Sequence, residues 1–146
     1  MQIVGISSGG GHLTELLTIA RHLPTMIALI TESGAVLRNS ESDLPLQPIH
    51  DPHRSLTGYL LNAVQAARYL LRYRPDVVIS TGAGMTVPLF LLARFSGVTC
   101  VYVETGARIS TPSMTGRILY PFASLFIVQN SALLPFYRKA VVASIL

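Results

Sequence analysis

The sequence predicts an α/β fold, a Rossmann-like parallel sheet with helices on both faces. Short apolar segments typical of strands alternate along the chain with longer amphipathic segments typical of helices. Residues 77–80 are a largely β-branched run, which fits a central parallel strand covered on both faces. A glycine-rich turn follows the first strand, as in nucleotide-binding βα units. At 146 residues, the chain is expected to form one domain, residues 1–146.

In the first half of the chain, strands are expected at residues 2–6 and 26–30 and helices at residues 13–23 and 55–73. Residues 33–54 contain three prolines and no clean period, so we expect a long loop with a short strand at residues 46–49. Ser55 is the expected N-cap of the second helix. The predicted buried face of that helix consists of Leu56, Leu60, Ala63, Ala67 and Leu70, which recur at helical spacing.

In the second half, strands are expected at residues 77–80, 99–103, 125–128 and 140–143 and helices at residues 86–95, 113–120 and 133–137. Pro88 is tolerable because it falls in the first turn of its helix. Cys100 is the only cysteine and lies in an apolar strand, so it is expected to be a buried small hydrophobe in a reducing compartment.

The composition points to a partner chain or a membrane surface. Half of the residues are hydrophobic and 12% are charged, against about 25% charged in an average soluble domain. The net charge is +4, and ten of the eleven cations are arginine, which pairs well with phosphate. We expect no nucleic-acid partner, because the cations do not form one cluster.

The sequence predicts neither a membrane span nor a metal site. It enters its first strand at Gln2, without a signal peptide, and no apolar run is long enough to cross a bilayer. Membrane attachment is therefore expected to be peripheral or through another subunit. His22, His50, His53 and Cys100 have no metal-ligand spacing, so no metal is expected.

The glycine-rich turn after the first strand is a candidate anion site. Ser8, Gly9, Gly10 and Gly11 precede the first helix, where free backbone N–H groups and the helix dipole favour a negative charge. His12 follows at the helix start and could take or give a proton near neutral pH. These residues predict a phosphate-binding loop beside a titratable side chain. The alternative is a tight turn with a solvated histidine.

Further candidates follow the other strands, because ligands of open α/β sheets bind at the carboxyl ends of the strands. Thr81, Gly82 and Gly84 form a second glycine turn that would let a sugar or phosphate approach the backbone. Glu104 and Arg108 place a carboxylate and a guanidinium on one loop, and the carboxylate could orient His12 or act as a base itself. The alternatives are a plain tight turn and a surface ion pair.

A dinucleotide-dependent oxidoreductase is a competing interpretation. Glu32 stands 21 residues after Gly11 (32 − 11), where a ribose-binding acid would lie. Thr14, however, stands where that motif requires its third glycine.

Several ordered stretches carry a family likeness: residues 6–16, 74–84 with 87–88, 103–108, 112–117 and 126–129. Together they resemble the asparagine-linked glycosylation protein fourteen family, which includes acceptor-side subunits of bacterial exopolysaccharide and capsule glycosyltransferases. More distantly, the chain is similar to the amino-terminal half of the lipid-II-forming N-acetylglucosaminyltransferase. The likeness covers nearly the whole sequence.

The resemblance implies the N-terminal Rossmann-like half of a GT-B glycosyltransferase. Such a chain would bind a lipid-diphosphate acceptor at the cytoplasmic face of the membrane, peripherally. A small partner chain would supply the half that binds the UDP-sugar, commonly UDP-GlcNAc, with the active site between the two. No cofactor is implied beyond this UDP-sugar, which is a substrate.

The resemblance also assigns roles to residues. Ser8, Gly9, Gly10, Gly11 and Arg108 would hold the acceptor diphosphate, Thr81, Gly82 and Gly84 would bind substrate, and either His12 or Glu104 would be the catalytic base. The alternative is a non-catalytic adaptor that recruits a partner glycosyltransferase to the membrane and activates it.

Two departures from the family pattern are visible. Members from the dolichol pathway usually begin with a membrane-spanning helix, and this sequence shows none, so a bacterial-type member is expected. Asn130 stands where the family commonly has tryptophan. The candidate membrane-facing surface is residues 110–120 with Arg108 and Arg117, together with Arg54 and Tyr59 at a helix start. Alternatively, these faces meet the partner chain.

Overall fold

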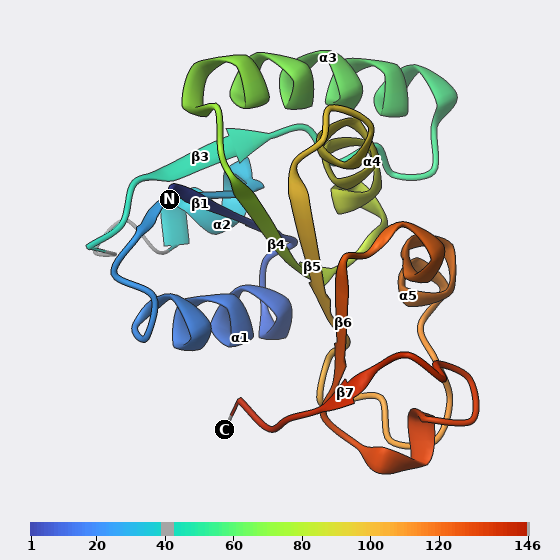
Figure 1. Cartoon of the computed structure of the whole chain (residues 1–146). Helices are drawn as coiled ribbons and strands as arrows, with labels where there is room; N and C mark the ends of the chain where they lie inside the picture. The colour runs from blue at the N-terminus through green and yellow to red at the C-terminus, as the bar shows by residue number, and fades with distance from the viewer. Residues whose placement is uncertain (39–42, 146) are drawn as a thin grey trace.

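The computed structural model describes residues 1–38 and 43–145, and it confirms the α/β fold (Figure 1). All strand pairings in the sheet are parallel, in the order β3-β2-β1-β4-β5-β6-β7. The strands are β1 (Ile3–Ser7), β2 (Met26–Glu32), β3 (Leu46–Ile49), β4 (Val77–Gly82), β5 (Thr99–Val103), β6 (Leu125–Val128) and β7 (Val141–Val142).

Helices cover both faces of this sheet. They are α1 (Gly11–Ala20), α2 (Ser33–Arg38), α3 (Leu56–Tyr73), α4 (Val87–Phe95) and α5 (Met114–Leu119), with 3₁₀ turns η1 (Gly84–Thr86), η2 (Tyr120–Phe122) and η3 (Ser131–Leu133). In Figure 1, α1 lies on one side of the strands, and α3, α4 and α5 lie on the other. Among the described residues, no helix combines the length and the apolar character needed to cross a bilayer.

The strands send alternate side chains to two separate cores, because successive residues of a strand point to opposite faces. Ile3 packs in the core under α1, while its neighbour Val4 packs in the larger core under α3 and α4. Ile79 and Val78 of β4 divide in the same way. The central strands therefore have both faces buried, as their continuous apolar runs predict.

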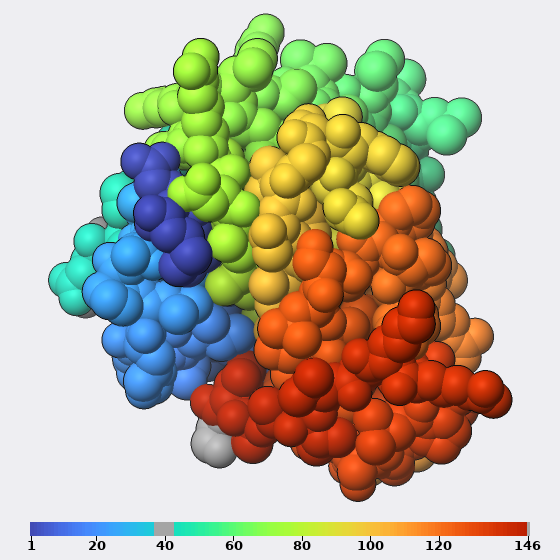
Figure 2. All heavy atoms as spheres, viewed as in Figure 1, coloured from blue at the N-terminus to red at the C-terminus, as the bar shows by residue number. Residues whose placement is uncertain are grey.

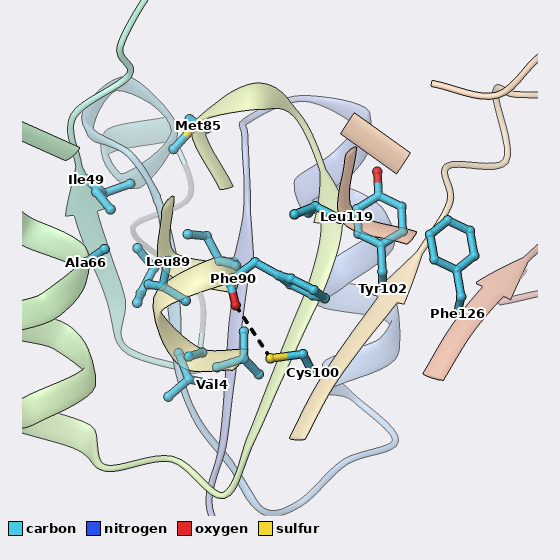
Figure 3. Packing of buried hydrophobic residues seen from close by; sticks show 14 of the residues in the cluster. Val4, Ile49, Ala66, Met85, Leu89, Phe90, Cys100, Tyr102, Leu119 and Phe126 are labelled. Carbon is cyan, nitrogen blue, oxygen red and sulfur yellow. Dashed lines mark hydrogen bonds between the residues drawn. The ribbon is translucent and has the colours of Figure 1, made fainter. Parts of the chain in front are cut away.

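Aromatic packing and Cys100 fill the larger core (Figure 3). Phe90 meets Tyr102 edge to face, and Tyr102 stacks on Phe126. The Cys100 thiol lies 3.6 Å from the backbone oxygen of Phe90. Burial raises the pKa of the Cys100 thiol to about 11, so it stays protonated near neutral pH, in agreement with its expected role as a small hydrophobe.

Element boundaries differ from the sequence expectation at several points. Residues 33–54 are not one loop with a strand, because α2 occupies their first part; the predicted strand at residues 46–49 is confirmed. Residues 39–42 of that segment lie outside the described residues. Helix α1 starts at Gly11 and ends at Ala20, earlier than expected at both ends. The helix expected at residues 133–137 does not form: the 3₁₀ turn η3 ends at Leu133, and residues 134–136 form a turn.

The predicted buried face of α3 is confirmed only in part: Leu70 packs against the larger core, but the two leucines nearest the start of the helix do not. Leu56 is 88% exposed and Leu60 is 68% exposed, whereas the buried residues of the helix are Gly58, Asn62 and Ala66. Gly58 has no side chain and Ala66 has only a methyl group, so α3 can lie close to the rest of the protein here. Leu56 and Leu60 point outward, whereas Leu70 packs against the larger core.

Hydrogen bonds cap the start of α3 and tie the helix to neighbouring segments. The Ser55 hydroxyl accepts a hydrogen bond from the backbone N–H of Gly58, so the expected N-cap is confirmed. The side-chain amide of Asn62 donates to the backbone oxygens of His50, at 2.7 Å, and Met85, at 3.1 Å. Asn62 thus ties α3 to the segment after β3 and to η1.

Gly58→Ala is expected to destabilise the fold. A Cβ at Gly58 would lie 2.6 Å from the backbone oxygen of Pro52, so α3 must shift, at a cost of about 1–3 kcal/mol. Gly11→Ala is the matched control, because a Cβ there meets nothing within 4 Å and the residue is helical. Chemical denaturation should show lower stability for the first variant only. Equal stability of the two variants would contradict the close approach.

Candidate functional site

The strand order places a switch point between β1 and β4, the usual ligand position in such sheets. The chain leaves β1 through the first glycine turn and α1, and it leaves β4 through the second glycine turn and η1. The loops that follow β5 and β6 end at the same edge of the sheet, because all the strands are parallel. The structure therefore brings the predicted turns to one edge.

His12 and Thr81 are joined by two reciprocal hydrogen bonds across this switch point. The Nδ1 atom of His12 lies 2.7 Å from the backbone oxygen of Thr81, and the Thr81 hydroxyl donates to the backbone oxygen of His12, also at 2.7 Å. A carbonyl oxygen only accepts, so Nδ1 must carry the proton. In the neutral ring, Nε2 is then left with a free lone pair and can accept a proton.

The second glycine turn makes room for the His12 ring. Gly82 has a φ of +114°, and a Cβ built on it would lie 3.2 Å from the ring carbon Cε1 of His12 and 3.0 Å from the hydroxyl of Tyr102. The next residue, Ala83, has a φ of +76°, an unfavourable conformation for a residue with a side chain. Local strain of this kind is often found at functional sites.

Thr81 and Gly82, which the sequence predicts to bind substrate, both contact His12. Thr81 is fully buried, and its hydroxyl and its backbone oxygen each form a hydrogen bond with His12. Gly82 likewise packs against the His12 ring. Both residues thus contact His12, and their role in substrate binding stays a prediction. Gly84 begins η1 and faces the hydroxyl of Tyr59, which lies in the first turn of α3.

The first glycine turn leaves the start of α1 open. Gly10 is the N-cap, with a φ of +69° that suits glycine, and no side chain caps the helix. A Cβ on Gly10 or on Gly11 would meet no atom within 4 Å. The helix start therefore lies without a side-chain cap, beside the half-buried Ser8 and Gly9. This arrangement suits an anion.

Glu104 lies inside the protein and not at the surface. Its side chain is fully buried. One carboxylate oxygen accepts from the backbone N–H of Thr105, and the other accepts from the backbone N–H and hydroxyl of Ser113 and from the hydroxyl of Tyr137. Hydrogen-bond donors compensate its charge, as burial requires. The burial argues against two sequence interpretations, the general base and the surface pair with Arg108.

Glu104 instead organises the start of α5. The Ser113 hydroxyl that donates to Glu104 also accepts from the backbone N–H of Gly116 and so caps the helix. Gly116 is required here, because a Cβ would collide with the Glu104 carboxylate and the Tyr137 hydroxyl. Arg108, by contrast, is exposed on the loop between β5 and α5.

Glu15 was missed as a candidate. It lies on the buried side of α1, and one of its oxygens accepts hydrogen bonds from the loops that follow β5 and β6, through Thr105, Gly106 and Gln129. The sequence held one signal of this. Glu15 stands between Leu13 and Leu16, both of which are buried, so a carboxylate falls within the apolar side of an amphipathic helix.

Tyr137→Phe is expected to lower stability near neutral pH by about 1.5–3 kcal/mol, because it removes a buried hydrogen bond to a carboxylate. Burial first, and then the charge of Glu104, raise the pKa of Tyr137 above the usual tyrosine range. Folding therefore loses stability as the pH rises above about 10, where the unfolded chain releases its phenolic protons first. Denaturation at pH 8 and pH 11 should show a weaker pH dependence in Tyr137→Phe than in the wild type. An unchanged dependence would contradict this account.

Comparison with known proteins identifies relatives along most of the chain. The family description "Oligosaccharide biosynthesis protein Alg14 like" matches residues 50–146. The UDP-N-acetylglucosamine transferase subunit ALG14 of Homo sapiens is 27% identical over 174 residues, covering 97% of this chain and 81% of the human protein. The protein of that name from Rattus norvegicus is 38% identical over 169 residues, covering 93% of this chain and 78% of the rat protein.

Solved structures share the fold. MurG of Acinetobacter baumannii superposes with a TM-score of 0.76 at 17% identity, over 99% of this chain and 44% of MurG. UDP-N-acetylglucosamine 2-epimerase of Rickettsia bellii superposes with a TM-score of 0.75 at 14% identity, over 94% of this chain and 41% of the epimerase. This chain spans less than half of either protein and has the fold of the N-terminal half of a GT-B glycosyltransferase. On the family match and the rat relative, the chain belongs to the Alg14-like family of oligosaccharide biosynthesis proteins.

Proposed function

We propose that this chain is the acceptor-side subunit of a two-chain inverting glycosyltransferase. A second, small chain would bind the UDP-sugar, UDP-GlcNAc or another hexose nucleotide, and this chain would bind a lipid-diphosphate-linked acceptor. Two observations support the proposal. The curated relatives are named as transferase subunits, and the chain spans less than half of the structurally similar MurG and epimerase chains. Family membership also favours sugar transfer over the oxidoreductase suggested by Glu32.

The open start of α1 is the proposed site of the acceptor diphosphate. Unpaired backbone N–H groups and the helix dipole attract phosphate, and the absence of a side-chain cap leaves the position free. Arg108, exposed on the loop after β5, would add a guanidinium. These groups would supply charge stabilisation from the protein itself, and no cofactor is part of the proposal beyond the UDP-sugar substrate.

The observation that carries the catalytic part of the proposal is the 2.7 Å contact between Nδ1 of His12 and the backbone oxygen of Thr81. The Nδ1 proton is committed to the backbone oxygen of Thr81, so Nε2 is the atom available as a base. In the proposed step, Nε2 takes the proton of an acceptor hydroxyl, the hydroxyl oxygen bonds to the anomeric carbon, and the bond from that carbon to UDP breaks. Attack from the face opposite UDP inverts the anomeric configuration. Because Glu104 is buried, the proposal favours His12 as the base.

His12→Asn removes the proposed base, Nε2, but keeps a donor for the hydrogen bond to Thr81. The asparagine amide can still donate to the Thr81 oxygen in place of Nδ1, but it has no counterpart of Nε2. Turnover of the assembled two-chain enzyme on a polyprenyl-diphospho-sugar, assayed with a panel of UDP-sugars, should fall by about tenfold or more. Assembly with the partner chain should be unchanged.

His22→Ala is the matched control, because His22 also lies near α1 and its Nδ1 contacts a backbone oxygen, that of Thr18. It should retain wild-type turnover. Full activity of His12→Asn would exclude His12 as the base. Full turnover by the partner chain alone on a soluble acceptor would favour the adaptor alternative.

We further propose that the exposed apolar side chains at the start of α3 and on α5 contact the cytoplasmic face of the membrane. Figure 2 shows α3 along the top of the molecule, with its side chains projecting outward. Leu56 and Leu60 of α3 and Met114 of α5 are large apolar residues that are exposed. From residue 52 onward, the sequence has nine of its eleven Lys and Arg residues and only two acids, Asp76 and Glu104. Exposed apolar side chains beside arginines suit anionic lipid.

Leu56→Gln combined with Leu60→Gln should weaken binding to vesicles containing anionic lipid by about tenfold or more, since each leucine loses part of its apolar transfer energy. Flotation of the purified chain measures this. Phe136→Gln is the control, because it removes an exposed apolar side chain that lies outside these helices. Undiminished flotation of the double variant would contradict the membrane surface. Loss of assembly with the partner chain would instead assign the surface to that chain.

A further inference from the structure

Glu15 is a buried carboxylate that the proposed chemistry does not use. Its side chain is 9% exposed, and it sits one helical turn beyond the open start of α1. Burial of a carboxylate is unfavourable unless hydrogen bonds compensate it. The position of those hydrogen bonds therefore indicates what Glu15 does.

One oxygen of Glu15 gathers three donors from two different loops. Oε1 accepts from the backbone N–H of Gly106 at 2.8 Å, from the hydroxyl of Thr105 at 3.2 Å and from the side-chain amide of Gln129 at 3.3 Å. Gln129 also donates to the backbone oxygen of Glu104. Glu15 thus connects α1 to the segments after β5 and β6.

The segment held by Glu15 is a tight turn that ends in Arg108. We call residues 105–108 the Arg108 turn. The backbone N–H of Arg108 donates to the backbone oxygen of Thr105 at 3.0 Å, and that of Ala107 donates to the Thr105 hydroxyl at 3.3 Å. The same hydroxyl donates to Glu15. The turn is locked internally, so its attachment to Glu15 fixes where the Arg108 backbone lies.

The second carboxylate oxygen of Glu15 argues that stability is not its whole role. Oε2 is buried and has no hydrogen-bond partner among the described residues. A buried acceptor without a partner lowers stability. A carboxylate at this position is therefore not explained by stabilisation of the fold alone.

We infer that Glu15 is a positioning residue, which fixes the Arg108 turn relative to the start of α1 and so sets the geometry in which Arg108 meets the acceptor diphosphate. The inference rests on the proposed function. Helix α1 would then place both the proposed base and the proposed diphosphate ligand Arg108. It bears His12 in its first turn, and it holds the Arg108 turn through Glu15. The two groups would keep their relative position because they share α1.

The assembled two-chain enzyme provides the kinetic test. Glu15→Ala should raise the KM for the polyprenyl-diphospho-sugar by about tenfold or more, because a displacement near 1 Å is enough to lose such an interaction. The KM for the UDP-sugar should stay unchanged. If Glu15 acts through Arg108, Glu15→Ala combined with Arg108→Ala should be no worse than Arg108→Ala alone. Additive effects of the two substitutions would overturn the inference.

Two further variants separate positioning from a loss of stability. Glu15→Gln keeps one acceptor oxygen and should restore much of the acceptor KM. Thr31→Val is the matched control, because Thr31 also has a buried side-chain oxygen without a hydrogen-bond partner among the described residues, and it should leave both KM values unchanged. Equal effects of Glu15→Ala and Thr31→Val would overturn the inference.

A measurement on the chain itself distinguishes failure of this inference from failure of the proposed function. Amide hydrogen exchange should show a protected Gly106 N–H in the wild type, rapid exchange in Glu15→Ala, and renewed protection in Glu15→Gln. Unchanged protection in Glu15→Ala would overturn the positioning role, whatever the enzyme does. Loss of protection in a chain whose assembled wild-type enzyme transfers no sugar would support the positioning role and reject the proposed function.

Discussion

The reciprocal hydrogen bonds between His12 and Thr81 are the contact on which the candidate site depends. They join the first turn of α1 to the end of β4 across the switch point of the sheet. The pair fixes the histidine tautomer, and it explains the second glycine turn, since Gly82 leaves space for the ring. Without this contact, the glycine turns would be two separate loops. With it, the proposed anion site at the start of α1 and the proposed base share one rigid support.

Charge inside the protein is arranged differently from charge on its surface. Hydroxyls, amides and backbone N–H groups donate to both oxygens of the buried Glu104 carboxylate and to one oxygen of Glu15. The exposed arginines of the C-terminal part are therefore left free of these two acids and can meet an external anion. The same distribution suits both an acceptor diphosphate and an anionic lipid surface, which would place the acceptor and its bilayer on neighbouring parts of the protein.

Helix α3 shows how amphipathic spacing can be misinterpreted. Its large apolar residues recur at helical spacing, which normally indicates a buried face. In the structure, Gly58, Asn62 and Ala66 face inward, and Leu56 and Leu60 face outward. Periodicity identifies an apolar stripe, but it does not say whether that stripe meets the core of the same chain, a partner chain or a bilayer. Only the packing of α3 against the rest of the protein resolves this.

The sequence by itself determined the α/β class, most strands, the N-cap at Ser55 and the family, because these follow from local periodicity, turn residues and ordered motifs. It also predicted that His12, Thr81, Glu104 and Arg108 lie at one edge of the sheet, since the carboxyl ends of parallel strands share that edge. Only the tertiary structure decided which of them are buried and what each of them contacts. Burial and hydrogen-bond partners depend on contacts between residues far apart in the chain, such as Glu15 with Gly106, and no local pattern encodes those contacts.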